Sequence, residues 1–103
     1  MDITQLEPQV VWTNFSALNA VPRPSKKEGQ VIAFIKKFGE DLGLETRVDE
    51  VGNVIIKKPA TAGMEDRTPV VLQSHLDMVC QKNADVDFDF DTQGIPIEIS
   101  GDW

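Results

Sequence analysis

The sequence predicts an α/β fold in which two helices precede three short β-strands. Two stretches, at about 3–20 and 25–42, carry apolar residues at spacings of three and four, which is the stripe of an amphipathic helix. Three apolar runs rich in β-branched residues follow at 44–48, 54–56 and 70–74. With 41% apolar residues among 103, the chain carries enough apolar side chains for a sizeable core.

Local signals set the expected ends of the two helices. Within 3–20, Pro8 is expected in the first turns, where its missing N–H is tolerated. The second helix is expected to begin with a capping box, in which the Ser25 hydroxyl accepts from a backbone N–H three residues on and the Glu28 carboxylate accepts from the N–H of Ser25. Its end is predicted at Gly43, where a left-handed residue is wanted.

The three β-rich runs are expected in different surroundings. Residues 44–48 and 54–56 are predicted to pair as a hairpin around the turn residues at 51–53. The run Val70–Ser74 follows a proline and is typical of a buried central strand, which would lead directly into His75.

A further strand is predicted near the end of the sequence. Apolar residues alternate at Ile95, Ile97 and Ile99, and the turn signal Ser100-Gly101-Asp102 follows. Trp103 would open the return strand. Because a domain seldom ends directly after a hairpin turn, we expect the natural chain to continue.

Composition and charge exclude several classes of function. Ten basic and seventeen acidic residues give a net charge of -7, so the basic footprint that a nucleic-acid partner needs is missing. No apolar run approaches the roughly 18 residues of a membrane span. The single cysteine, Cys80, cannot form an internal disulfide, and it is expected to be a buried or half-buried structural thiol. We therefore expect a soluble, cytoplasmic protein.

The pair His75 and Asp77 is the strongest candidate site. At the end of a strand, positions i and i+2 project to the same side, so both groups would face one crevice. The imidazole could ligate a metal while the carboxylate orients the site, although the spacing equally allows a purely structural pair. A triad with Ser74 is disfavoured, because Ser74 and His75 would point to opposite faces.

The acidic segment at 82–92 has a partial likeness to a calcium loop. Counting from Asp87 places acids at positions one, three and five and Glu98 at position twelve. Position six is Thr92, however, instead of the glycine that makes the sharp turn. An exposed loop with Phe88 and Phe90 anchored inward is therefore favoured.

Four segments of the sequence stand out together: Pro22–Glu28, Val51–Val54, Val71–Val79 and Ile99–Trp103. In order and spacing they resemble a known family over essentially the whole chain, the aminoacyl-histidine dipeptidases (Xaa-His dipeptidases, peptidase D) within the carnosinase-like zinc metallopeptidases. The Ser-His-Leu-Asp-Met-Val core at 74–79 is specific to that group.

The resemblance implies that residues 1–103 are the N-terminal portion of an α/β catalytic domain, with a mixed sheet flanked by helices and two zinc ions in the complete site. His75 would be a metal ligand and Asp77 the catalytic carboxylate that orients the site. The other ligands and a general-base glutamate would lie beyond Trp103. The complete protein would hydrolyse Xaa-His and related dipeptides by metal-activated water and could form a homodimer.

A catalytic zinc takes about three protein ligands, so the 103-residue chain with its one histidine is expected to be inactive alone. Two other functions stay open at this point. A noncatalytic α/β interaction module, with a structural His75–Asp77 pair, is the alternative from a different class. A hydrolase of the same fold with another substrate, such as an aminoacylase or a tripeptidase, is the third possibility.

Overall fold

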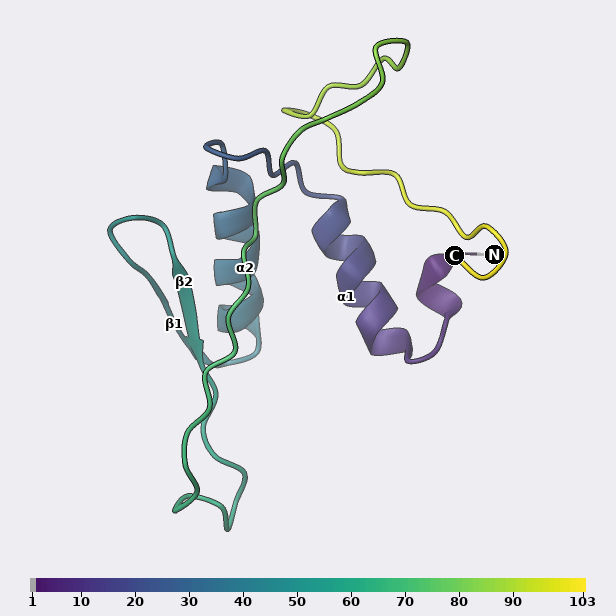
Figure 1. Cartoon of the computed structure of the whole chain (residues 1–103). Helices are drawn as coiled ribbons and strands as arrows, with labels where there is room; N and C mark the ends of the chain where they lie inside the picture. Colours follow the sequence, from purple (N-terminus) through teal and green to yellow (C-terminus); the bar gives the residue numbers. More distant parts are fainter. Residues whose placement is uncertain (1) are drawn as a thin grey trace. The chain divides into compact units, whose positions relative to one another are not determined.

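The computed structural model describes residues 2–103, which divide into two compact units. One unit holds the chain up to Val31 together with Asp77–Trp103, and the other holds Ile32–Leu76. Figure 1 shows a short 3-10 helix, two α-helices and one antiparallel strand pair along the described chain. The predicted α/β class is confirmed. No helix within residues 2–103 is long and apolar enough to cross a membrane.

The first predicted helix is interrupted at Pro8. A 3-10 turn at Ile3–Gln5 comes first, and helix α1 spans Gln9–Asn19. Pro8 is the N-cap of α1, with an extended ψ of 122°, so the expectation of one helix from about residue 3 to 20 was wrong at its start. The physical reason is that proline keeps the preceding residue out of the helical region, which prevents a helix from continuing through Glu7.

Helix α2 spans Gly29–Asp41 and ends as the sequence predicts. Gly43 has a left-handed φ of 72°. The N–H of Gly43 donates to the carbonyl of Glu40 at 2.9 Å, and the N–H of Leu44 donates to the carbonyl of Gly39 at 3.1 Å. These two bonds make a Schellman motif, which satisfies carbonyls that the helix end would otherwise leave open.

The predicted hairpin is confirmed. Strand β1 (Glu45–Val48) pairs antiparallel with β2 (Val54–Lys57), with Thr46 opposite Ile56. The loop between them is closed by the Asp49 carboxylate, whose Oδ1 accepts from the backbone N–H of Val51 at 3.0 Å and of Asn53 at 2.8 Å. The Asn53 side-chain amide donates to Asp49 Oδ2 at 2.8 Å, and this bond is the main cause of a lowered Asp49 pKa.

Helix α2 packs against the hairpin through a glycine. Gly39 is buried, and a Cβ built there would overlap the Thr46 hydroxyl and lie 3.0 Å from Cδ1 of Ile56. Thr46 and Ile56 are the half-buried residues of their cross-strand pair. The close approach of helix and strands in this unit therefore depends on the missing side chain at residue 39.

The prediction of a buried central strand at Val70–Ser74 was wrong. In the structure this segment forms no strand and is exposed. The segment is not paired with any other described residue, and Val71 and Leu72 are 89% and 92% exposed. A strand is defined by hydrogen bonds to a neighbour, and an apolar run is buried only where a second layer covers it. The described residues supply neither to this run.

The strand predicted at 95–99 does not form either, but its side chains alternate between half-buried and exposed as expected. Ile95, Ile97 and Ile99 are half-buried, while the residues between Ile95 and Ile99 are exposed. The predicted turn follows, since Ser100 and Trp103 exchange backbone hydrogen bonds of 3.0 Å in both directions. This part of the sequence thus has the predicted turn without the strand pairing.

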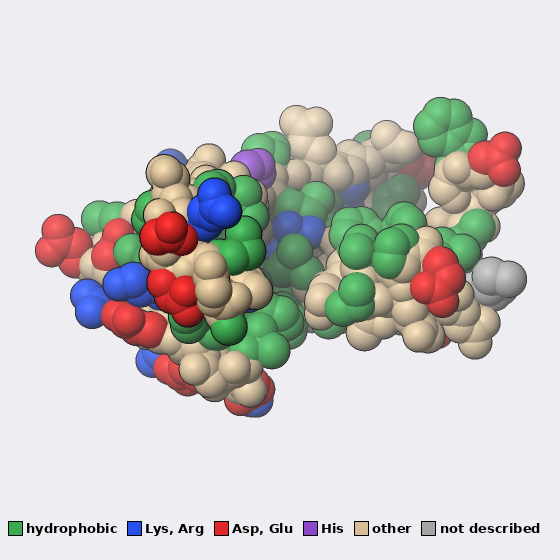
Figure 2. Space-filling model, turned by 90° about the horizontal axis from the view of Figure 1, so that it is seen from below, with side chains coloured by type: hydrophobic (Ala, Val, Ile, Leu, Met, Phe, Trp, Pro, Cys, Tyr) green, Lys and Arg blue, Asp and Glu red, His purple; other side chains and the backbone are tan. Residues whose placement is uncertain are grey.

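The buried core is smaller than composition suggests. Val31 and Pro24 are the only apolar side chains that are buried among residues 2–103. Figure 2 shows apolar side chains open at the surface among charged ones. The expectation of a sizeable core was therefore wrong for the described chain, because many of its apolar side chains contact no covering layer.

Candidate functional site

Asp77 lies in a segment that is tied to a distant part of the sequence. Pro24 and Met78 form an isolated parallel bridge within the first unit. The N–H of Met78 donates to the carbonyl of Arg23 at 2.9 Å, and the N–H of Ser25 donates to the carbonyl of Met78 at 3.0 Å. Both backbone polar groups of Met78, the residue immediately after Asp77, are thereby hydrogen-bonded.

The Ser25 side chain reaches the Asp77 carboxylate directly. Its hydroxyl donates to Asp77 Oδ2 at 2.5 Å and lies 3.2 Å from the carbonyl oxygen of Met78. Both partners are partly buried, and 52 positions separate Ser25 from Asp77 in the sequence. A distance of about 2.5–2.7 Å is typical of a hydroxyl that donates to an ionised carboxylate.

The predicted capping box at Ser25 is therefore wrong. The Ser25 N–H donates to Met78, and the Glu28 carboxylate accepts from the N–H of Lys26 at 2.7 Å. Helix α2 begins at Gly29, three residues later than the start at Lys26 that a box at Ser25 would require. The hydroxyl of Ser25 is bonded to Asp77 and its N–H to Met78, and a local cap would have used these same two groups.

A strained tight turn carries Ser25. The N–H of Lys27 donates to the carbonyl of Pro24 at 2.9 Å, and Lys26 has a left-handed φ of 69°. For a residue with a side chain this conformation costs about 1–2 kcal/mol. The bridge at Pro24 and the hydrogen bond of Ser25 are contacts of the kind that hold a strained turn in place.

The two predicted site residues differ in their surroundings. Asp77 is half-buried and accepts from Ser25, whereas His75 is exposed and follows the extended segment at 70–74 (Figure 2, purple). No strand is assigned through 75–77, so the predicted basis for placing both side chains on one strand face is not present. Within residues 2–103, no group of three or more His, Cys, Asp or Glu side chains is placed to hold a metal ion.

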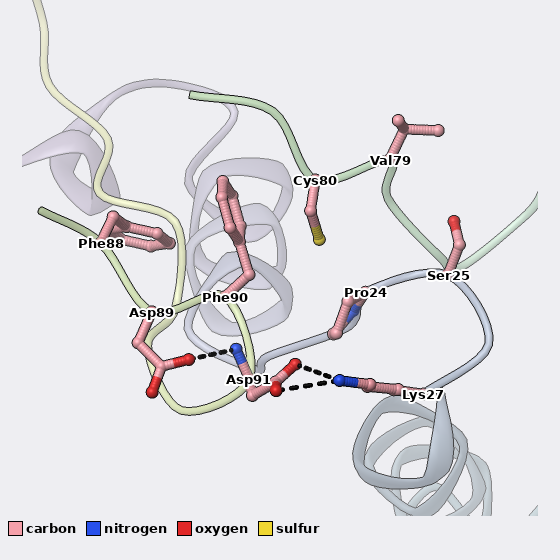
Figure 3. Close-up of a pocket in the computed structure, with 9 residues that line it drawn as sticks. All are labelled: Pro24, Ser25, Lys27, Val79, Cys80, Phe88, Asp89, Phe90 and Asp91. Atoms are coloured by element: carbon pink, nitrogen blue, oxygen red, sulfur yellow. Dashed lines mark hydrogen bonds and ion pairs between the residues drawn. The ribbon is translucent and has the colours of Figure 1, made fainter. Parts of the chain in front are cut away.

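Next to Ser25, a shallow cavity of about 490 Å³ opens in the first unit (Figure 3). Phe88 and Phe90 are half-buried at its wall, with ring centroids 4.7 Å apart in an edge-to-face arrangement. Both rings are thus anchored as the sequence predicts. The lining residues are Pro24, Ser25, Lys27, Val79, Cys80, Phe88, Asp89, Phe90 and Asp91.

Cys80 is exposed, which corrects the expectation of a buried or half-buried thiol. Its thiol lies 3.8 Å from the carbonyl oxygen of Met78. The residue follows the bridge at Met78, and no described element covers it on the open side of the cavity. The apolar residues that precede Cys80 in the sequence did not lead to its burial, because Val79 and Gln81 on either side of it are themselves exposed.

The acidic loop beside the cavity is organised by its own side chains. Asp89 Oδ1 accepts from the N–H of Asp91 and Oδ2 accepts from the Thr92 hydroxyl, each at 2.9 Å. The Thr92 bond is the main cause of a lowered Asp89 pKa. Asp91 forms an exposed ion pair with Lys27 at 3.0 Å, and its hydrogen bond raises the Lys27 pKa.

Comparisons with known proteins place this arrangement in context. No protein-family model matches the chain. The cytosol non-specific dipeptidase of Escherichia coli (strain K12) is 46% identical over 102 residues, which are 99% of this chain and 21% of that protein. The crystal structure of aminoacylhistidine dipeptidase from Vibrio alginolyticus matches with a TM-score of 0.95 and 44% identity, over 100% of this chain and 21% of that one.

The chain resembles a segment of the aminoacyl-histidine dipeptidases, as the sequence predicts. It spans about a fifth of the length of these dipeptidase relatives. An N-terminal portion of such a dipeptidase fits both matches. Relatives of this kind are peptide hydrolases, and the TM-score of 0.95 shows that this chain has the fold of the matched fifth of the solved dipeptidase.

Proposed function

We propose that residues 1–103 are the N-terminal portion of the catalytic domain of a zinc-dependent dipeptidase. The observation that carries this proposal is the match to two dipeptidases over 99% and 100% of the chain, in sequence and in fold. The complete protein would hydrolyse Xaa-His and related dipeptides by metal-activated water. The 103-residue chain alone would be inactive, because it covers about a fifth of those relatives.

His75 and Asp77 are suited to form part of a zinc site. The His75 imidazole is exposed and offers a nitrogen ligand of the type that zinc takes, so it would hold one metal ion. Asp77, fixed by Ser25, would orient the ligand arrangement as a catalytic carboxylate. The remaining ligands would come from the rest of the complete protein. Two zinc ions, when bound, supply an acidified water and polarisation of the scissile carbonyl.

The proposed partners follow from the relatives and from charge. The substrate would be a dipeptide, and a homodimer of the complete protein is part of the proposal. The net charge of -7 supports a protein without a nucleic-acid partner. The name of the relative from Escherichia coli includes the word cytosol, which supports a cytoplasmic location without membrane attachment.

Zinc binding and dipeptide hydrolysis test the proposal together. We would measure zinc binding by calorimetry at neutral pH on the complete protein and on residues 1–103, each with and without His75→Ala. The complete protein is expected to bind about two zinc ions and to cleave an Xaa-His dipeptide. His75→Ala should remove most of both properties, while Gln81→Ala, at an exposed position six residues later in the sequence, should change neither.

One result would reject the dipeptidase proposal outright. If the complete protein bound no zinc and cleaved no dipeptide, His75 and Asp77 would be a structural pair in a noncatalytic interaction module. If it cleaved acylated amino acids or tripeptides in preference to dipeptides, the metal site would stand and the substrate would be corrected.

A further inference from the structure

We propose that Ser25 is a positioning residue, which holds the Asp77 carboxylate in the orientation that the metal site requires. This inference rests on the proposed function and deepens it, because it adds a residue 52 positions away from Asp77 to the same site. The sequence alone assigned Ser25 to the start of a helix, so its relation to Asp77 emerges from the structure.

The hydroxyl has one proton, and the distances show where that proton goes. Oγ of Ser25 lies 2.5 Å from Asp77 Oδ2 but 3.2 Å from the Met78 carbonyl oxygen. The shorter contact is in the range of a charge-assisted hydrogen bond, which is about twice as strong as a neutral one. The bond therefore fixes the position of Oδ2 of the Asp77 carboxylate.

The backbone around Ser25 is fixed independently of its side chain. The N–H of Ser25 bonds to the carbonyl of Met78, and the N–H of Met78 bonds to the carbonyl of Arg23. The carbonyl of Pro24 closes the tight turn through Lys27. These bonds do not need the serine hydroxyl, so its removal should leave the two segments paired.

The hydroxyl thus has a role that the backbone bonds do not duplicate. The helix-cap role is excluded, because α2 begins at Gly29. Without the hydroxyl, the Asp77 carboxylate would lose the short bond that fixes Oδ2 in the observed orientation. Partners that orient a metal site in this manner typically change metal affinity or activity by about 10–100-fold when removed.

The test compares Ser25→Ala with Ser25→Thr in the complete protein. Ser25→Ala is expected to raise the zinc dissociation constant about tenfold and to lower kcat by about 10–100-fold at saturating zinc, with KM within about twofold. Ser25→Thr keeps a hydroxyl and should recover most of the loss. The absorption spectrum of the cobalt-substituted protein should change in Ser25→Ala and stay unchanged in Ser25→Thr.

Ser16→Ala in helix α1 is the matched control, because it removes a hydroxyl from another half-buried serine of the same unit. It should alter neither zinc affinity nor kcat. If Ser25→Ala does not fold, as judged by circular dichroism, Ser25→Cys replaces it and should show a loss between those of Ala and Thr.

The outcomes separate this inference from the proposed function. A folded Ser25→Ala or Ser25→Cys protein with unchanged zinc affinity, kcat and cobalt spectrum would overturn the positioning role alone. A wild-type complete protein that neither binds zinc nor cleaves dipeptides would overturn the proposed function, and the positioning role with it.

Discussion

The hairpin β1–β2 and the run Val70–Ser74 are both rich in β-branched apolar residues, yet only the hairpin forms strands (Figure 1). In the hairpin, each strand finds its partner across a short loop closed by Asp49. Val71 and Leu72, by contrast, are almost fully exposed and unpaired with any other described residue. The intrinsic β preference of a run is thus realised only where a partner strand is available.

The difference also bears on the proposed site. The hairpin is stabilised within its own unit by the approach of Gly39 to Thr46 and Ile56. The run Val70–Ser74 leads directly to His75, the proposed metal ligand. We infer that the hairpin is ordered by local contacts, whereas the segment that carries His75 needs partners supplied by the complete protein.

The largest expected effect comes from Leu72→Ala. In the complete protein, where we expect partner strands to cover this run, the substitution should lower the free energy of unfolding by about 2–5 kcal/mol. In residues 1–103 alone, where Leu72 is 92% exposed, the change should stay within about 0.5 kcal/mol. Urea denaturation of both proteins measures the difference.

Val51→Ala is the control for that comparison, because Val51 lies in the hairpin loop and is 78% exposed. It should have a small effect in both proteins. Equal effects of Leu72→Ala in the long and the short protein would show that no partner covers the run, and the contrast with the hairpin would disappear.

Gly39→Ala should have the next largest effect, on the hairpin side. A methyl group there overlaps the Thr46 hydroxyl and presses on Ile56, and overpacking of this kind costs about 1–3 kcal/mol. Gly29→Ala, at the start of the same helix, meets no atom within 4 Å and should be neutral or stabilising. Thermal unfolding of both variants provides the measurement, and a Gly39→Ala protein as stable as wild type would contradict the close packing.

Acid should produce the smallest effect, through the hairpin loop. The hydrogen bond from the Asn53 side chain is the main cause that lowers the Asp49 pKa below its ordinary 3.8. A lowered folded-state pKa means that Asp49 stabilises the hairpin above pH 3.8, and that this contribution is lost as the pH falls through the lowered pKa.

Nuclear magnetic resonance can follow this change at the N–H groups of Val51 and Asn53, which donate to Asp49. Their signals should titrate with a midpoint below 3.8 in wild type. In Asp49→Asn, which keeps an acceptor oxygen without the charge, the titration should vanish. A wild-type midpoint at or above 3.8 would contradict the bonding that the structure shows in this loop.

Sequence predicted the fold where the determining contacts are local. The end of α2 depends on Gly43 and its two neighbouring bonds, all within five residues, and the hairpin depends on a short loop. The predictions failed where a local signal had a non-local competitor, as at Ser25, or no partner to pair with, as in Val70–Ser74. They also failed at Pro8, which delays the start of α1 to Gln9.

The candidate site divides in the same manner. Asp77 and His75 were found from a motif of contiguous residues, and their roles stay predictions until metal binding is measured. The relation of Ser25 to Asp77 could not be derived from sequence periodicity, because 52 positions separate the two residues. One signal was available in the sequence. Ser25 lies in Pro22–Glu28, one of the segments that carry the family resemblance, and the start of a helix does not by itself require that specific sequence.

The separation of Ser25 from Asp77 also has a consequence for the newly made protein. A ribosome that adds about 5–20 residues per second completes Asp77 about 3 to 10 s after Ser25. Throughout that interval the Met78 groups that pair with Arg23 and Ser25 in the folded structure have not yet been made. The bond that orients the Asp77 carboxylate therefore forms only after Asp77 has been added, with a serine that was incorporated 52 positions earlier.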